Sequence, residues 1–553
     1  MSDDQGMMNV CDRKFEIATL IGIIALALLL RLPAVNWGMP PANISHFPSL
    51  HPDEIGVMKA LRQIRPEKLD FTPEAAHIEG TLSYYLWAGL AGIAWVAGVP
   101  MNWEGYHRVL LLGRLSTVFL DICSVVLVFF ILRRMRIGSA LSLLGALMYA
   151  IIPFEVMQSV YMRTHVLSNL FILLTIYLSL RIYEAENNRL FMLIGFVLGL
   201  GAANRYVFAM VAIIPYCFLL YKLFVINKPE HVDLKTIVAG IFDRRAFIMA
   251  AFLIAGLFIG DMPLFLRFDE VKPYLLEQYN YSKMNQGHPG DVVFLHRLGA
   301  YFASLIPAGT FLLWIPFYIS FIGMIFIKEY RKYFIPITPF FIVYLVLMAK
   351  GYPILTIRTV LPLFPYFVLI SILAIDAFSN SIRNKQFLQL ASTAIMGFVL
   401  ITSGIYSFAC SRAMGDKQTD PFHNLYAYFE SIPQIKNKQV VIGFWAEGWW
   451  RTVFDDHVES IIKKSIGENA RLVHDEKALS GLDYVVLYSY KPTICSIESV
   501  IQSIKGTDQK YVVKAFKKDI TIGNLKMIYD YHPHDFLYAF PLVVVLEKMG
   551  KNR

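Results

Sequence analysis

Charged residues are scarce in this chain. Only 17% of its 553 residues are Asp, Glu, Lys or Arg, whereas 56% are hydrophobic and the mean hydropathy is +0.50. A single soluble core cannot bury so much apolar surface. The composition therefore excludes a soluble globular protein and indicates a polytopic α-helical membrane protein.

Cysteine is also rare, with five residues, no CxxC pair and no Cys/His spacing typical of zinc ligands. Neither a disulfide framework nor a zinc site is indicated, although Cys410 and Cys495 are both expected outside the cytoplasm, where a disulfide is an open alternative. A glycine-rich phosphate loop is missing too, which argues against a nucleotide-binding domain.

Basic residues do not gather in one patch, although the formal net charge is +9. They alternate between loops, which is a signal of membrane topology rather than of nucleic-acid binding. The apolar segment Phe15 to Leu32 follows Arg13 and Lys14 and has no small-residue cleavage site, so it is expected to be a retained anchor. We expect a cytoplasmic N-terminus and a location in the plasma (inner) membrane.

Apolar runs between these basic loops predict about eleven membrane-spanning helices. Two alternatives are open for Asn204-Arg205, which is either a tight outer turn or a kink inside one long segment. The predicted spans are 15–33, 109–132, 138–154, 166–183, 190–204, 206–224, 246–266, 298–326, 333–349, 359–377 and 388–408.

A large first outer loop, residues 34–108, separates the first two predicted spans, and long loops of this kind usually carry function. Its apolar stretch from Leu82 to Val99 has the length of a further span. An odd extra crossing would place the basic run from Arg133 to Arg136 outside, however. We therefore predict helices that lie along the membrane interface, where Tyr and Trp are favoured.

The character of the chain changes near residue 410, where short β-rich runs begin to alternate with polar helical stretches. This pattern predicts a small α/β domain over 410–553, outside the membrane, after a transmembrane catalytic domain over 1–409. The β-rich runs are 439–444, 484–488, 511–515 and 542–546.

An acidic pair stands out in the first outer loop, within His51-Pro52-Asp53-Glu54. Proline at the first helical position followed by two acids is typical of a helix start, because carboxylates favour the positive end of the helix dipole. A helix start also presents a carboxylate rigidly. The structural and the functional interpretation are therefore compatible.

Several short motifs carry a resemblance to a known family. The chain resembles the membrane glycosyltransferases of the C-type (GT-C) fold, in the group of protein O-mannosyltransferases and aminoarabinose transferases of lipid A, whose hallmark is an Asp-Glu pair in the first outer loop. It departs from many relatives after Arg163, where Thr164-His165 replaces an acidic residue. The other matching motifs are Gly80-Thr-Leu-Ser-Tyr-Tyr-Leu-Trp87, Gly113-Arg-Leu-Ser-Thr117, Arg133-Arg134, Pro153-Phe154, Tyr161-Met-Arg-Thr-His165, Asn204-Arg-Tyr206 and Arg358-Thr-Val-Leu-Pro-Leu-Phe-Pro365.

The resemblance implies an inverting glycosyltransferase that moves a sugar from a polyprenyl-phosphate donor to an extracytoplasmic glycan, lipid or protein acceptor. A phosphate on the anomeric carbon leaves without a general acid, so the reaction needs chiefly one carboxylate to accept the acceptor's proton. We assign that role to Asp53, with Glu54 in support. The leaving phosphate suits the planar fork of arginine, and we expect it near Arg358, Arg205 and Arg163.

Further candidate site residues are Glu155, His165, His51 and His288, although His51 also suits a helix cap. No metal or other cofactor is required by the resemblance, and a divalent cation between the acidic pair and a histidine is the alternative. Two other functions stay open at this point. They are a lipid-diphosphate-dependent oligosaccharide transferase or polymerase, and a secondary transporter or lipid flippase.

Overall fold

The structure is a computed structural model of residues 1–553. The residues that it describes are 3–39, 49, 51–65, 68, 70–73, 79–100, 103–184, 187–227, 234–284, 293–309, 321, 324, 326–351, 357–382, 386–416, 421–432, 440–446, 459, 461–465, 470–473, 483–489, 511–517, 521–522, 525–526 and 542–548.

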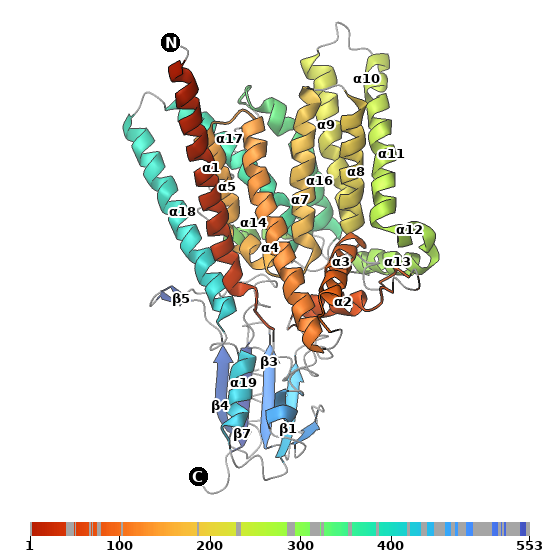
Figure 1. Ribbon diagram of the computed structural model, residues 1–553, viewed down its shortest axis with the longest axis vertical. Coiled ribbons are helices and arrows are strands. Elements are labelled where there is room, and N and C mark those ends of the chain that lie inside the picture. Colours follow the sequence, from red (N-terminus) through yellow and green to blue (C-terminus); the bar gives the residue numbers. More distant parts are fainter. Residues whose placement is uncertain are drawn as a thin grey trace. The chain divides into compact units, whose positions relative to one another are not determined.

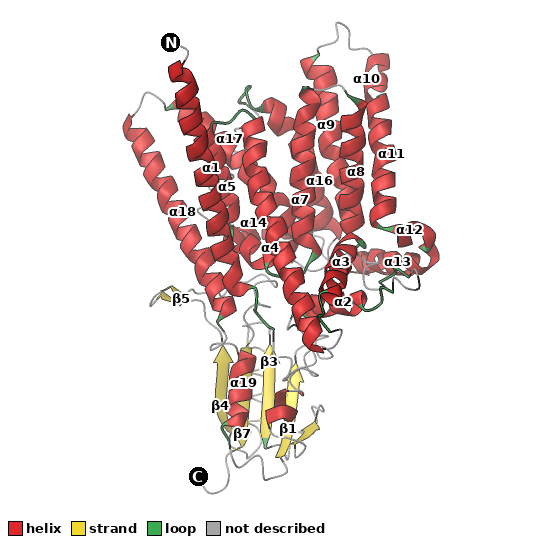
Figure 2. Ribbon diagram, viewed as in Figure 1, coloured by secondary structure: helices red, strands yellow, loops and turns green. Residues whose placement is uncertain are grey.

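Helices fill the first three quarters of the chain (Figures 1 and 2), and a helix occupies part or all of each predicted span. Within the described ranges, seven helices are long and apolar enough to cross a membrane, or eight with the pair α5 and α6, which is bent by 61°. The count of eleven spans stays a prediction. The helices are α1 Asp3–Arg31, α4 Trp103–Arg134, α5 Ser139–Ala150, α6 Pro153–Ser159, α7 Thr164–Leu180, α8 Asn188–Asn204, α9 Ile213–Tyr221, α11 Arg244–Gly260, α14 Val293–Gly309, α16 Arg331–Gly351, α17 Phe364–Ser381 and α18 Gln386–Gly415.

Shorter helices connect or extend these elements. The 15-residue helix α3 (Leu82–Val96) is shorter than the roughly 20 residues that a span needs, which agrees with the predicted interfacial position. The others are α2 Pro52–Leu61, α10 Leu234–Ile241, α12 Met262–Leu266, α13 Phe268–Met284, α19 Pro421–Glu430, the 3-10 turns η1 Leu32–Ala34, η4 Arg181–Tyr183, η5 Tyr206–Ala212 and η7 Ile357–Leu363, and the π turn η6 Lys222–Ile226.

The chain turns at Arg205, between α8 and η5. Arg205 is extended, with φ of −153° and ψ of 120°, and α9 then runs back beside α7 (Figure 1). Of the two alternatives for Asn204-Arg205, the structure has the tight turn.

Helices α8 and α11 pack backbone against backbone. A Cβ atom added to Gly195 or Gly199 would lie 2.2 Å from a carbonyl oxygen of α11, and one added to Gly256 would lie 2.4 Å from a carbonyl oxygen of α8. Small residues allow such close approach between helices in a membrane. This packing fixes the end of α8, where Arg205 lies.

The chain divides into two compact units, which we describe separately. One comprises Met1–Leu32, Val57–Ile93 and Gly113–Phe408, and the other Pro33–Gly56, Ala94–Leu112 and Ala409–Arg553. The second unit holds a five-stranded mixed sheet in the order β2-β1-β3-β7-β4, in which β1 is parallel to β2 and β3, and β7 is antiparallel to β3 and β4. The strands are β1 Val440–Ala446, β2 Ala470–Val473, β3 Tyr484–Ser489, β4 Tyr511–Lys517 and β7 Leu542–Lys548, with a separate hairpin of β5 Thr521–Ile522 and β6 Leu525–Lys526.

Each of the four β-rich runs expected from the sequence forms one strand of this sheet, namely β1, β3, β4 and β7. Helix α19 packs on the sheet, with the Phe429 ring edge-on to Tyr484 and the Tyr428 hydroxyl donating to Glu547. That this part forms a separate domain outside the membrane stays a prediction.

Candidate functional site

The acidic pair begins helix α2, as its sequence predicts. The Nδ1 atom of His51 accepts a hydrogen bond from the backbone N–H of Asp53 (3.2 Å), and the His51 carbonyl accepts one from the N–H of Glu54 (3.1 Å). His51 therefore caps the helix. The Asp53 side chain, in the first turn, is half-buried.

Glu54 has a different environment from Asp53, because its side chain is fully buried. Its Oε2 accepts a hydrogen bond from the Ser49 hydroxyl (2.5 Å), and the same hydroxyl oxygen accepts one from the His51 N–H (2.9 Å). Glu54 thus holds the turn that leads into α2.

Four charged or polar side chains converge where α7 begins and α8 ends. We call Glu79, Arg163, His165 and Arg205 the arginine cluster. Arg163 is the N-cap residue of α7, His165 lies in its first turn, and Arg205 is the C-cap residue of α8. The carboxylate between the arginines comes from Glu79, which precedes α3. Its Oε1 lies 3.9 Å from Arg163 Nη2 and 3.8 Å from Arg205 Nη2, and its Oε2 accepts a hydrogen bond from the Thr164 hydroxyl at 2.9 Å.

His165 lies between the two guanidinium groups. Arg205 Nη1 makes a short contact with its Nδ1, and Arg163 Nη2 is 3.4 Å from its Nε2. A neutral imidazole has only one acceptor nitrogen. Which of the two contacts is a hydrogen bond depends on which ring nitrogen carries the proton. In either tautomer, only one of the two arginines can donate to the ring.

The formal charge of the arginine cluster is positive, because two arginines face one glutamate. Arg163 is 8% exposed and Arg205 13% exposed at the side chain, so both charges are largely shielded from solvent. Partly buried cations attract anions more strongly than solvated ones. The geometry therefore suits an oxyanion with several oxygens, such as a phosphate.

Polar contacts continue from the cluster along α8 and α11. Asn204 donates to the Thr164 carbonyl (2.9 Å) and to the Ser168 hydroxyl (2.7 Å), and it also contacts Ser83. Beside it, Asp261 accepts hydrogen bonds from the hydroxyls of Tyr206 (2.7 Å) and Thr81 (3.1 Å). These bonds fix the ends of α7 and α8 against the segment that carries Glu79.

Sequence reasoning missed Glu79 and Asp261. Glu79 lies in a long loop, where no helical pattern of apolar residues indicates which side chains face inward. The one feature of the sequence that could have pointed to Glu79 is its place directly before the Gly80 motif. Asp261 lies within the span predicted over 246–266, but the structure ends α11 at Gly260.

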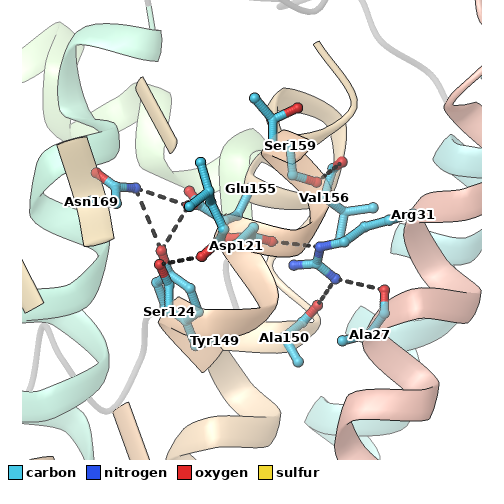
Figure 3. A network of polar contacts seen from close by, with 12 residues as sticks. Ala27, Arg31, Asp121, Ser124, Tyr149, Ala150, Glu155, Val156, Ser159 and Asn169 are labelled. Atoms are coloured by element: carbon cyan, nitrogen blue, oxygen red, sulfur yellow. Dashed lines mark hydrogen bonds and ion pairs between the residues drawn. The ribbon is translucent and has the colours of Figure 1, made fainter. Parts of the chain in front are cut away.

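The other candidate residues lie in separate places. Arg358 is half-buried in η7, which packs against α7. Glu155 is fully buried in α6, where its Oε1 accepts hydrogen bonds from Tyr149 and Asn169 (Figure 3). His288 lies outside the described residues. In the part of the chain that the structure describes, no group of three His, Cys, Asp or Glu side chains is arranged to hold a metal ion.

Fold and site together define a polytopic helical membrane protein with a cationic site at the ends of two neighbouring helices. Residues 108–258 match the family model described as "Dolichyl-phosphate-mannose-protein mannosyltransferase". This segment contains Arg163, His165 and Arg205. The match confirms, over these residues, the resemblance to the GT-C membrane glycosyltransferases.

The matches among solved structures include three proteins, each with a TM-score below 0.5. The Archaeoglobus fulgidus oligosaccharyltransferase, in a complex with Zn and sulfate, is 13% identical, with 85% of this chain and 67% of that chain covered and a TM-score of 0.44. ArnT from Cupriavidus metallidurans, bound to undecaprenyl phosphate, is 9% identical. The match covers 95% of this chain and 97% of that chain, with a TM-score of 0.45.

The third is the S. cerevisiae protein O-mannosyltransferase Pmt1-Pmt2 complex bound to the sugar donor, which is 18% identical with a TM-score of 0.33. The similarity covers 46% of this chain and 34% of that chain, so this chain spans about a third of the length of the Pmt1-Pmt2 chain that it matches. None of the curated proteins compared matches the chain in sequence.

Proposed function

We propose that this protein transfers a sugar from a polyprenyl-phosphate donor to an extracytoplasmic glycan, lipid or protein acceptor. The observation that carries this proposal is the arginine cluster, in which Arg163 and Arg205 converge on His165 beside the carboxylate of Glu79. The family match over residues 108–258 supports the same class of reaction.

The arginine cluster would bind the phosphate of the donor. A phosphate monoester or diester presents oxygens that guanidinium groups can contact in pairs, with charge-assisted hydrogen bonds worth about 1.5–3 kcal/mol each. Because a neutral imidazole has only one acceptor nitrogen, one of the two arginines points an N–H group at a ring nitrogen of His165 that cannot accept it. An added phosphate oxygen would give that N–H group an acceptor. Arg358 is a third candidate for the same phosphate.

The transfer itself needs a proton acceptor. In the proposed step, the oxygen of the acceptor hydroxyl attacks the anomeric carbon, and its proton passes to the carboxylate of Asp53. The bond between the anomeric carbon and the phosphate oxygen breaks on the opposite face, and the phosphate keeps the electron pair. Configuration at the anomeric carbon is therefore inverted. The arginines stabilise the negative charge that develops on the phosphate.

The remaining assignments follow the same proposal. Glu54 supports the start of α2, and no metal or other cofactor is required for the step. The N-terminus lies in the cytoplasm and residues 410–553 lie outside it, in a protein of the plasma membrane.

Binding of a polyprenyl monophosphate to the purified protein tests the proposal. We expect the variants Arg163→Gln and Arg205→Gln to bind this lipid about 10-fold to about 150-fold more weakly, which corresponds to the loss of one charge-assisted contact of about 1.5–3 kcal/mol. The control is Arg65→Gln, because Arg65 is exposed and forms its ion pair with Asp70.

A lipid diphosphate serves as the second ligand. Tighter binding of the diphosphate than of the monophosphate would favour a lipid-diphosphate donor. Equal binding by Arg65→Gln, Arg163→Gln and Arg205→Gln would remove the arginine cluster from the donor site.

A further inference from the structure

A second polar network lies inside the helix bundle, among residues that are fully buried. Figure 3 shows Arg31 of α1, Asp121 of α4 and Glu155 of α6 gathered beside the bend between α5 and α6. Arg31 Nε lies 2.5 Å from Asp121 Oδ2. On the other side of Glu155, its Oε1 accepts hydrogen bonds from Tyr149 (2.7 Å) and Asn169 (2.8 Å). Five helices therefore meet in one network.

The network completes the backbone hydrogen bonding at the bend. A chain that bends by 61° inside a membrane leaves carbonyl groups without helical partners, and lipid offers none. Arg31 Nη1 donates to the Ala150 carbonyl (2.9 Å), and the Ser407 hydroxyl donates to the Ile151 carbonyl (2.5 Å). Pro153, at the start of α6, has no N–H to satisfy. The bend is thus a built feature of the fold.

Charge does not balance in this network when every group is ionised. Arg31 supplies one positive charge, whereas Asp121 and Glu155 supply two negative ones, and a buried charge without a partner is strongly unfavourable. Asp121 Oδ1 and Glu155 Oε2 also receive no N–H or O–H donor from the described residues. Figure 3 shows the Asp121 and Glu155 side chains next to each other, so a proton on either carboxyl group gives the other an O–H donor and removes one of the two negative charges.

We propose that Glu155 is a positioning residue for Arg163, and that it acts as a neutral carboxylic acid whose proton is shared with Asp121. Glu155 ties α6 to Asn169, which lies in the second turn of α7. The first residues of α7 and its cap are Arg163, Thr164 and His165, so the same helix carries half of the arginine cluster. Only four residues separate the end of α6 from α7, and a shift of α6 would move Arg163 directly.

Glutamine tests this proposal, which rests on the proposed function for its binding readout. In Glu155→Gln, the amide oxygen still accepts from Tyr149 and Asn169, and the amide N–H donates to Asp121 in place of the shared proton. We expect its binding of a polyprenyl monophosphate to stay within twofold of the parent protein. In Glu155→Leu both functions are lost, and we expect binding to weaken by about tenfold to about a hundredfold, as for a small misplacement of a reacting group.

Thr175→Val is the matched control. Thr175 is a buried residue of the same helix α7, and its hydroxyl makes no hydrogen bond to the described residues. Valine has nearly the same shape. We expect binding and thermal stability of this variant to match those of the parent protein. A loss of binding in Glu155→Gln equal to that in Glu155→Leu would overturn the proposal.

Infrared spectroscopy provides a readout that does not depend on the proposed function. At neutral pH the parent protein should show the carbonyl stretch of a buried protonated carboxylic acid, and this band should be absent from Glu155→Gln. A parent protein without this band would overturn the shared proton, whatever lipid the arginine cluster binds. A band with no binding of any polyprenyl phosphate would instead count against the proposed function.

Discussion

Gly80 lies where a side chain has no room, next to Glu79 of the arginine cluster. Its φ is +126°, a conformation that L residues rarely adopt. A Cβ atom added there would lie 2.2 Å from the carbonyl oxygen of Ala203 and 2.9 Å from its carbonyl carbon, both in the last turn of α8. Gly80→Ala therefore disturbs the contact between the segment of Glu79 and the end of α8.

The size of the effect follows from these distances. Keeping the native backbone would cost about 1–3 kcal/mol in strain and about 1–3 kcal/mol in overpacking. The loop can avoid this cost by moving away from Ala203. To reach an ordinary contact of 3.4 Å from the present 2.2 Å, it must move by about 1.2 Å. Such a movement would break the bond from the Tyr206 N–H to the Glu79 carbonyl (3.2 Å) and shift the Glu79 carboxylate from the arginines.

We expect Gly80→Ala to weaken the binding of a polyprenyl monophosphate by up to about a hundredfold, because a misplacement of about 1 Å has effects of that order. Its thermal unfolding temperature should also fall. The matched controls are Gly89→Ala and Gly92→Ala in the neighbouring helix α3, where an added Cβ meets no atom within 4 Å. If Gly80→Ala binds the lipid and unfolds like these controls, the close contact with Ala203 does not position Glu79.

Three further changes probe other parts of the chain. Gly199→Ala should destabilise the α8–α11 packing by about 1–3 kcal/mol, since its Cβ would lie 2.2 Å from the Leu253 carbonyl oxygen. Thermal unfolding in detergent measures this loss of stability. The control is Gly404→Ala of α18, where an added Cβ meets no atom within 4 Å. Arg31→Met should cost about 3–5 kcal/mol by leaving Asp121 without its cation, and the double variant Arg31→Met/Asp121→Leu should unfold at a higher temperature than Arg31→Met. Asp53→Asn should slow sugar transfer by about 10²- to 10⁴-fold in membranes supplied with donor while lipid binding is kept, and near-normal turnover would reject Asp53 as the base.

The helices and the four main strands could be predicted from the sequence, because length, apolar content and β-rich runs are local properties. The start of α2 was equally local, since proline and two acids mark it within four residues. Arg163 and Arg205 are also candidate residues in the sequence, because the family resemblance implies a donor phosphate and arginine suits a phosphate. No local sequence pattern predicts that both arginines converge on His165, because this requires α7 and α8 to pack side by side.

Partners that are distant in sequence explain the rest. Arg31 and Asp121 are 90 residues apart, and each looks like an isolated charge within an apolar helix. Glu79 and Arg205 belong to different parts of the chain. The close contact of Gly80 with Ala203 and the hydrogen bond from the Tyr206 N–H to the Glu79 carbonyl bring their backbones together. The break in the third predicted span is only partly a local feature. Pro153 indicates its position in the sequence, but the donors that bind its carbonyl groups come from the distant helices α1 and α18.

Three glutamates show why residue type alone does not assign a role. Glu54 is fully buried against the Ser49 hydroxyl, Glu79 lies between two arginines, and Glu155 shares a core network with neutral donors and a second acid. An acceptor hydroxyl cannot reach Glu54 unless the turn at Ser49 opens, whereas Asp53, one residue earlier, is half-buried at the surface of the first helical turn. Of the acidic pair, Asp53 is therefore the residue that we assign to the acceptor's proton, and the burial of Glu54 is what keeps Asp53 in place.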